Sequence, residues 1–153
     1  MMSINKRSFL KYTATSLTTM YCFWVSKSMA AWPEKLFNTR PSSNTTNLIT
    51  DNKDIQVSDK INIKAPEIAE NGAVVPVSVE INLPDIKTIS ILVDNNPSPL
   101  TSVFNLTEQC LPFVSTRVKM AETSRVVALA ETHQGKFFSA ARSIKVTIGG
   151  CGG

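Results

Sequence analysis

Residues 75–83 read Val-Pro-Val-Ser-Val-Glu-Ile-Asn-Leu, a strict alternation of apolar and polar side chains. A period of two is typical of a β-strand with one buried face and one face in water. The same alternation returns at residues 61–64, 89–93, 114–120 and 144–148, and two further apolar runs occupy residues 126–132 and 136–141. Proline cannot donate to a strand ladder, so Pro76 places its strand at an edge or a bulge.

Turn-forming residues separate these stretches, which gives about seven short strands. They are Asn71-Gly72, Pro84-Asp85, the segment 95–99, Thr123-Ser124 and Gln134-Gly135. Short alternating strands with turns every 8 to 12 residues are the pattern of an all-β, immunoglobulin-like β-sandwich. We expect this sandwich to occupy residues 60–148.

Residues 31–59 are polar and irregular, and the run Arg-Pro-Ser-Ser-Asn-Thr-Thr-Asn at 40–47 offers no apolar face. We expect a short helix from Glu34 to Thr39, followed by a linker. No internal repeat is evident in the chain.

Residues 1–30 have the organisation of an export signal. A basic head is followed by an apolar block at 12–25 and by Ser28-Met29-Ala30, whose small residues suit a signal peptidase. The block is shorter than the roughly 20 apolar residues of a membrane span and contains several threonines, so we expect no stable membrane anchor. The head, residues 5–11, resembles a twin-arginine signal in which Lys6 replaces the first arginine. The sequence therefore predicts cleavage after Ala30 and a periplasmic protein, the alternative being an amphipathic N-terminal helix.

The charge of the chain is concentrated in that leader. The 153 residues contain 16 Lys and Arg against 12 Asp and Glu, a net charge of +4. All four surplus charges, at Lys6, Arg7, Lys11 and Lys27, belong to a segment without acidic residues. The remaining chain is neutral, which argues against nucleic acid as a partner.

The segment Gly149-Gly150-Cys151-Gly152-Gly153 contains four of the six glycines of the chain. Glycine has the widest backbone freedom and no side chain to pack, so this composition predicts a flexible arm that carries the thiol of Cys151. From Ile148 the three steps to Cys151 span at most roughly 10 Å, enough for the thiol to enter a cleft of another protein. Two alternatives are a frayed terminus with an incidental thiol and a disulfide between Cys151 and Cys110.

No catalytic constellation or cofactor motif accompanies this thiol. His133 stands alone beside the Gln134-Gly135 turn, where we expect a solvated side chain rather than a metal ligand. Cys22 leaves with the predicted signal. We expect Cys110 to be a buried residue at the end of a strand, because free cysteines are usually buried.

Three segments carry a resemblance to a known family. Residues 66–77, the run Asp-Asn-Asn-Pro-Ser-Pro at 94–99, and the ending 146–153 resemble the SoxY family, the covalent sulfur-carrier subunits of periplasmic thiosulfate oxidation. The resemblance covers about Lys60 to Gly153. It implies an immunoglobulin-like sandwich that pairs with a SoxZ-like subunit and carries sulfur on Cys151 without being an enzyme or binding a cofactor or metal.

The resemblance also implies partner enzymes. A haem c-containing enzyme would join thiosulfate oxidatively to Cys151, and a manganese hydrolase would then release the outer sulfur as sulfate. In some organisms a molybdenum-containing sulfane dehydrogenase would oxidise the remaining sulfur. Lys6 and Cys110 depart from the family pattern.

Two other functions remain open at the level of the sequence. Gly152-Gly153 would suit a ubiquitin-like sulfur carrier that forms a thiocarboxylate, although that activation needs ATP and gives Cys151 no role. A secreted immunoglobulin-like binding module would explain the export signal and the sandwich, although not the arm.

Overall fold

The computed structural model describes residues 34–148. All of them belong to one unit of the chain, and they form two short helices followed by nine strands. The elements are α2 (Glu34–Asn38), α3 (Ser42–Thr50), β1 (Ile55–Val57), β2 (Ile61–Lys64), β3 (Ile68–Asn71), β4 (Val75–Ile81), β5 (Ile86–Val93), β6 (Leu100–Asn105), β7 (Phe113–Val118), β8 (Ser124–Thr132) and β9 (Phe137–Ile148).

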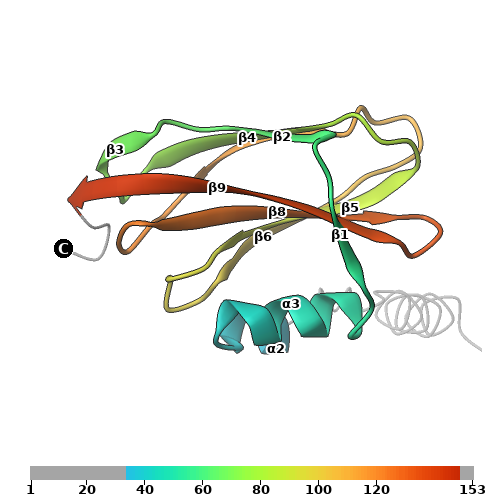
Figure 1. Ribbon diagram of the computed structural model, residues 1–153, viewed down its shortest axis with the longest axis horizontal. Helices are drawn as coiled ribbons and strands as arrows, with labels where there is room; N and C mark the ends of the chain where they lie inside the picture. The colour runs from blue at the N-terminus through green and yellow to red at the C-terminus, as the bar shows by residue number, and fades with distance from the viewer. Residues whose placement is uncertain (1–33, 149–153) are drawn as a thin grey trace, which may run out of the picture. The chain divides into compact units, whose positions relative to one another are not determined.

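The strands form two sheets. The larger has the order β1-β9-β8-β5-β6, with β3 pairing in parallel to the far part of β9, and the smaller has the order β2-β4-β7. Figure 1 shows the smaller sheet above the larger one, with α2 and α3 beyond the outer face of the larger sheet. The prediction of an all-β fold is therefore confirmed.

The alternation of residues 75–83 decides this packing, as the sequence predicts. Val75, Val77, Val79 and Ile81 are at most 3% exposed, and they pack between the sheets with alternate residues of β5 and β8 such as Ile89 and Val126. The side chains between them point outward because successive residues of a strand face opposite sides. One apolar core thus joins the two sheets.

Pro76 fits its strand for a local reason. β4 is the central strand of the smaller sheet, but β2 pairs only with residues 78–81 of β4. Among the described residues, Pro76 has one ladder partner, Arg117 of β7. The missing amide hydrogen of proline therefore falls where β4 is locally an edge.

A second apolar cluster lies on the other face of the larger sheet. Leu92, Leu100, Leu129 and Phe137 are buried there, with Leu36, Phe37 and Ile49 of the two helices packed against them. The helices therefore cover a sheet face that would otherwise expose apolar side chains to water.

The expected linker after the first helix is different in the structure. The helix predicted at Glu34 is present as α2, but residues Ser42–Thr50 form α3. Its polar side chains bond back to the preceding turn: the Thr46 hydroxyl donates to the Ser42 carbonyl, and the Thr45 hydroxyl donates to the Thr39 carbonyl. These bonds offset the poor helix propensity of Thr and Asn.

The strand count also differs from the expected seven. β1, β3 and β6 were not evident from the alternation, and the two runs expected at 136–141 and 144–148 are one strand, β9. β9 is the longest strand, and its far end leads directly to the glycine-rich segment.

Candidate functional site

The predicted site residues Cys151, Gly149, Gly150, Gly152 and Gly153 lie outside the described residues. The structure describes the strand that leads to them and what holds that strand in place. Its last residue, Ile148 of β9, has 68% of its surface exposed. The base of the segment that carries Cys151 is therefore at the surface.

β3 holds one side of this base. It runs parallel to β9 with Asn71 opposite Ile148. The amide of Gly72 donates to the Ile148 carbonyl at 2.8 Å, and the Thr147 hydroxyl donates to the Glu70 carbonyl at 2.9 Å. These bonds keep β9 in the sheet up to Ile148.

Thr123 holds the other side of the base. Its Oγ1 accepts a hydrogen bond from the Val146 amide at 3.0 Å. The loop that contains Thr123 is fixed in turn by Asn95, whose side-chain amide donates to the Thr123 carbonyl at 3.1 Å. The position of the last residues of β9 therefore depends on the loop between β5 and β6.

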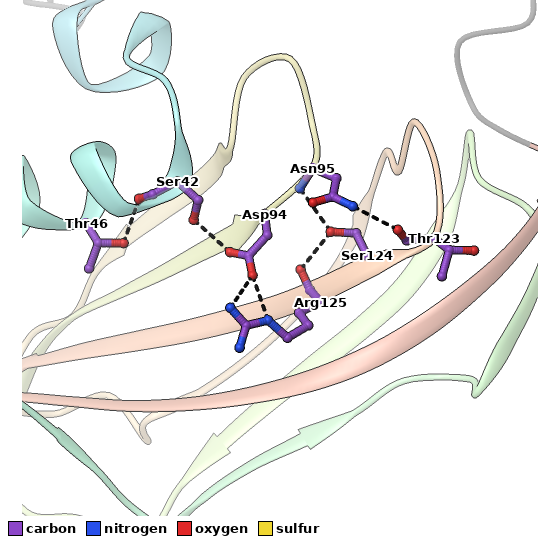
Figure 2. A network of polar contacts seen from close by, with 7 residues as sticks. All are labelled: Ser42, Thr46, Asp94, Asn95, Thr123, Ser124 and Arg125. Atoms are coloured by element: carbon purple, nitrogen blue, oxygen red, sulfur yellow. Dashed lines mark hydrogen bonds and ion pairs between the residues drawn. The ribbon is translucent and has the colours of Figure 1, made fainter.

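A polar network extends from Asn95 to the helices (Figure 2). Asp94 accepts hydrogen bonds from Arg125 Nε at 2.8 Å and from the Ser42 hydroxyl at 2.7 Å. Figure 2 shows these side chains converging from α3, the end of β5 and the start of β8. The network joins the helical layer to the end of the sandwich at which β9 finishes.

Asn96 continues this arrangement toward the smaller sheet. Its side-chain amide donates to the Lys119 carbonyl at 2.6 Å, and its Oδ1 accepts from the Ala121 amide at 2.9 Å. Residues 94–96 thus position the loop between β7 and β8, which in turn contacts the end of β9 that leads to the glycine-rich segment 149–153. The resemblance noted in the sequence included residues 94–99 but assigned them no role. Their role in holding the β7–β8 loop becomes visible only in the hydrogen bonds of the folded chain.

The structure overturns the expectation that Cys110 is buried. Cys110 is exposed in the loop between β6 and β7, directly after the polar run Thr107-Glu108-Gln109. The Thr107 hydroxyl lies 3.2 Å from the Cys110 sulfur and, with a backbone hydrogen bond from the same residue, lowers the pKa of the thiol. Hydrogen bonding stabilises the thiolate, which is the nucleophilic form.

Cys110 and His133 lie near each other, at the end of the sandwich opposite to Ile148. Both line a hollow of about 270 Å³ beside the Pro84-Asp85 turn. His133 is exposed, as expected.

No group of three or more His, Cys, Asp or Glu residues within 34–148 could hold a metal ion. None of the helices described here is long and apolar enough to cross a membrane.

The distance between Cys110 and Ile148 argues against a disulfide from Cys110 to Cys151 of the same chain. His133 precedes Phe137, the first residue of β9, and Ile148 lies at the other end of that strand. The eleven steps from Phe137 to Ile148 extend roughly 36 Å at ~3.3 Å each, whereas the three steps from Ile148 to Cys151 reach roughly 10 Å. Cys151 therefore cannot reach Cys110 of its own chain.

Comparison with known proteins gives a family match and a solved relative. The model of the family described as "Sulfur oxidation protein SoxY" matches residues 45–151. The sulfur carrier protein SoxY from Chlorobium limicola f thiosulfatophilum is 40% identical, with a TM-score of 0.64, and the alignment covers 71% of this chain and 97% of that chain. No curated protein matches.

More distant structures share the fold. A superoxide reductase (neelaredoxin) from Ignicoccus hospitalis is 17% identical with a TM-score of 0.53, over 60% of this chain and 94% of that chain. A putative superoxide reductase from Thermotoga maritima is 20% identical with a TM-score of 0.51, over 60% of this chain and 93% of that one. At these identities the likeness shows the fold alone.

Proposed function

This chain belongs to the SoxY family of sulfur oxidation proteins and has the role of a sulfur carrier, and we propose that it carries the sulfur covalently on Cys151. The family match extends through residue 151. That extent is the observation that carries the proposal, because it includes Gly149, Gly150 and the thiol itself. β9 provides a fixed base at Ile148, and the glycines beyond it supply the backbone freedom that a carrier arm needs.

The proposed chemistry takes place in partner enzymes, and the chain itself catalyses no step. In a haem c-containing enzyme, the Cys151 thiol and thiosulfate lose two electrons and one proton as a new S–S bond joins them. In a manganese hydrolase, water cleaves the bond to the outer sulfur, which leaves as sulfate, and a persulfide remains on Cys151. Where a molybdenum-containing sulfane dehydrogenase is present, it oxidises that persulfide sulfur.

The proposal places the protein in the periplasm after removal of residues 1–30, with a SoxZ-like subunit as its stable partner. The leader sequence supports export. Within residues 34–148, β6 and β7 each have one edge that pairs with no other strand, and this supports association, because unpaired strand edges favour pairing with another chain. We also assign the two-sheet fold to the immunoglobulin-like type. The other two functions, a ubiquitin-like thiocarboxylate carrier and a secreted binding module, lose support because the family match reaches Cys151.

The test is mass spectrometry of the full chain incubated with thiosulfate and the partner enzymes. We expect an adduct on the peptide that contains Cys151, and we expect its loss in Cys151→Ser. Cys110→Ser is the matched control and should load like the wild type. An adduct that persists in Cys151→Ser, or that depends on Cys110, would contradict the proposal.

A further inference from the structure

A hollow of about 400 Å³ lies between the β5–β6 loop and the end of β7. Its lining includes two basic residues, Arg117 and Lys119, whose side chains are exposed, and no acidic residue. Neither side chain forms an ion pair with any of residues 34–148. Glu122 is close in sequence, but it does not line the hollow. The hollow therefore offers two unpaired positive charges to an anion.

The hollow is close to the base of the carrier segment. Gly72 donates its amide to the Ile148 carbonyl at 2.8 Å, and its own carbonyl accepts from the Met120 amide at 2.7 Å. A single residue therefore separates the end of β9 from Met120, so the Ile148 carbonyl and the Met120 amide are at most about 9 Å apart. Met120 stands between Lys119 and Ala121, which both line the hollow. Cys151, with its reach of roughly 10 Å from Ile148, comes within range of this hollow.

The wall of the hollow is held in shape before any cargo arrives. Asn96 fixes the Lys119 carbonyl and the Ala121 amide. The Thr101 hydroxyl donates to the Ile91 carbonyl at 2.8 Å, and the Ser98 hydroxyl donates to the Phe37 carbonyl. A site whose polar groups are already bonded loses little further conformational freedom when a ligand binds.

We propose that this hollow is a resting site for the loaded arm, in which Arg117 and Lys119 bind the sulfonate that Cys151 carries after thiosulfate has been joined to it. The inference rests on the proposed function, because it needs sulfur on Cys151. The sulfonate is anionic, whereas an unmodified thiol is neutral over most of the physiological pH range. The loaded arm therefore rests reversibly at the surface of its own subunit between visits to partner enzymes, and it no longer binds there once a partner hydrolase has removed the sulfonate as sulfate.

The test loads the arm chemically, without any partner enzyme. In full-length Cys22→Ser/Cys110→Ser protein, the Cys151 thiolate attacks an inner sulfur of tetrathionate. Thiosulfate leaves and a Cys151–S–S–SO₃⁻ adduct forms. Methyl methanethiosulfonate gives the neutral control, in which a methylthio group is joined to the same sulfur and methanesulfinate leaves.

Backbone amide NMR shifts then report docking. We expect the amides of Thr101, Lys119 and Ala121 to shift in the sulfonate form but not in the methylthio form. The shifts should largely disappear in 1 M salt, because partly exposed charge pairs are screened. In Arg117→Gln/Lys119→Gln the ratio of docked to undocked arm should fall by about 2- to 5-fold per charge removed. Lys60→Gln/Lys136→Gln has the same net charge as Arg117→Gln/Lys119→Gln, and its loaded arm should dock as it does in the parent protein.

Equal shifts in the sulfonate and methylthio forms, or shifts that survive Arg117→Gln/Lys119→Gln, would overturn the resting site. Both replaced side chains are exposed, so the variant should fold. Its amide spectra check that it does. The two proposals fail separately. If partner enzymes load Cys151 but the hollow shows no response, the carrier function stands and the resting site falls. If the chemically loaded arm docks but enzymes never load Cys151, the resting site loses its cargo, and the thiosulfate proposal fails.

Discussion

The hydroxyl oxygen of Thr123 lies 3.0 Å from the amide nitrogen of Val146, three residues before Gly149, the first glycine of the glycine-rich segment. The same hydroxyl is 3.4 Å from the Val146 carbonyl. The Thr123 side chain of the β7–β8 loop thus forms hydrogen bonds to β9 near its end, on the side opposite to β3. The order of β9 near its end is a tertiary property, since it depends on a loop 23 residues earlier in the chain.

Thr123→Val should loosen the base of the arm without unfolding the sandwich. Valine keeps the shape of threonine but cannot accept the Val146 amide, and a lost hydrogen bond of this kind costs about 0.5 to 1.5 kcal/mol. We expect faster hydrogen exchange at Val146 and a correspondingly small shift of the urea midpoint. Thr147→Val removes the bond to Glu70 and serves as the comparison on the β3 side. Unchanged exchange at Val146 would show that Thr123 does not hold the strand.

Asn96→Ala should release the β7–β8 loop. The substitution removes the bond to the Lys119 carbonyl and leaves the Ala121 amide without its acceptor. The two losses should lower the free energy of unfolding by about 1 to 3 kcal/mol, as measured by urea denaturation. Asn82→Ala is a suitable control, because Asn82 is exposed and should change stability by less than about 0.5 kcal/mol. Equal effects of the two variants would contradict the role assigned to Asn96.

Thr107→Val should make Cys110 less reactive at neutral pH. The hydrogen bond of the Thr107 side chain is the main cause of the lowered pKa of Cys110. Removing it raises that pKa, so a smaller fraction of the thiol is ionised near pH 7 and alkylation slows. At a pH above both pKa values, the thiol is fully ionised in both proteins and the rates converge.

The measurement is the rate of iodoacetamide alkylation against pH, in a Cys22→Ser/Cys151→Ser background where Cys110 is the single thiol. Thr101→Val, changed at a distant hydroxyl, is the control. A rate profile for Thr107→Val that coincides with the parent at every pH would exclude the hydrogen bond as the cause.

The alternation of apolar residues made the central strands predictable, and its absence explains the strands that sequence reasoning missed. β6 reads Leu-Thr-Ser-Val-Phe-Asn, without a period of two, because it lies at an edge of the larger sheet and is only partly buried. β3 is four residues long and is set by its parallel register with β9, a long-range pairing that no local pattern encodes.

Local composition also misplaced two features near the site. Residues 42–50 lack an apolar stripe, so they resemble a linker until the back-bonding hydroxyls and the packing of α3 are seen. Free cysteines are buried on average, and the expectation that Cys110 is buried rests on that average alone. Its polar loop between two edge strands exposes it to water instead. In both cases tertiary context outweighed residue type. The prediction for Cys151 rests on the glycine pairs around it, a signal that needs no tertiary context, but Arg117 and Lys119 carry no such signal.

Ile91 and Leu92 are neighbours in β5 that belong to different cores, and the same truncation at each should have different consequences. Ile91 is buried between the two sheets, whereas Leu92 is buried beneath the helices. Each change to Ala should cost about 2 to 5 kcal/mol in the free energy of unfolding, from lost burial and the cavity left behind. Val103→Ala, at a side chain that is 36% exposed, should cost much less.

Hydrogen exchange separates the two cores. Leu92→Ala should increase exchange in α3 beyond the general loss of stability, because Ile49 packs against the same cluster. Ile91→Ala should increase exchange in β4 and β8 and leave the local opening of α3 unchanged. If both variants open α3 equally, the helical layer and the sandwich unfold as one cooperative unit. The network of Asp94, Arg125 and Ser42 would then couple the helices to the end of the sandwich at which β9 finishes.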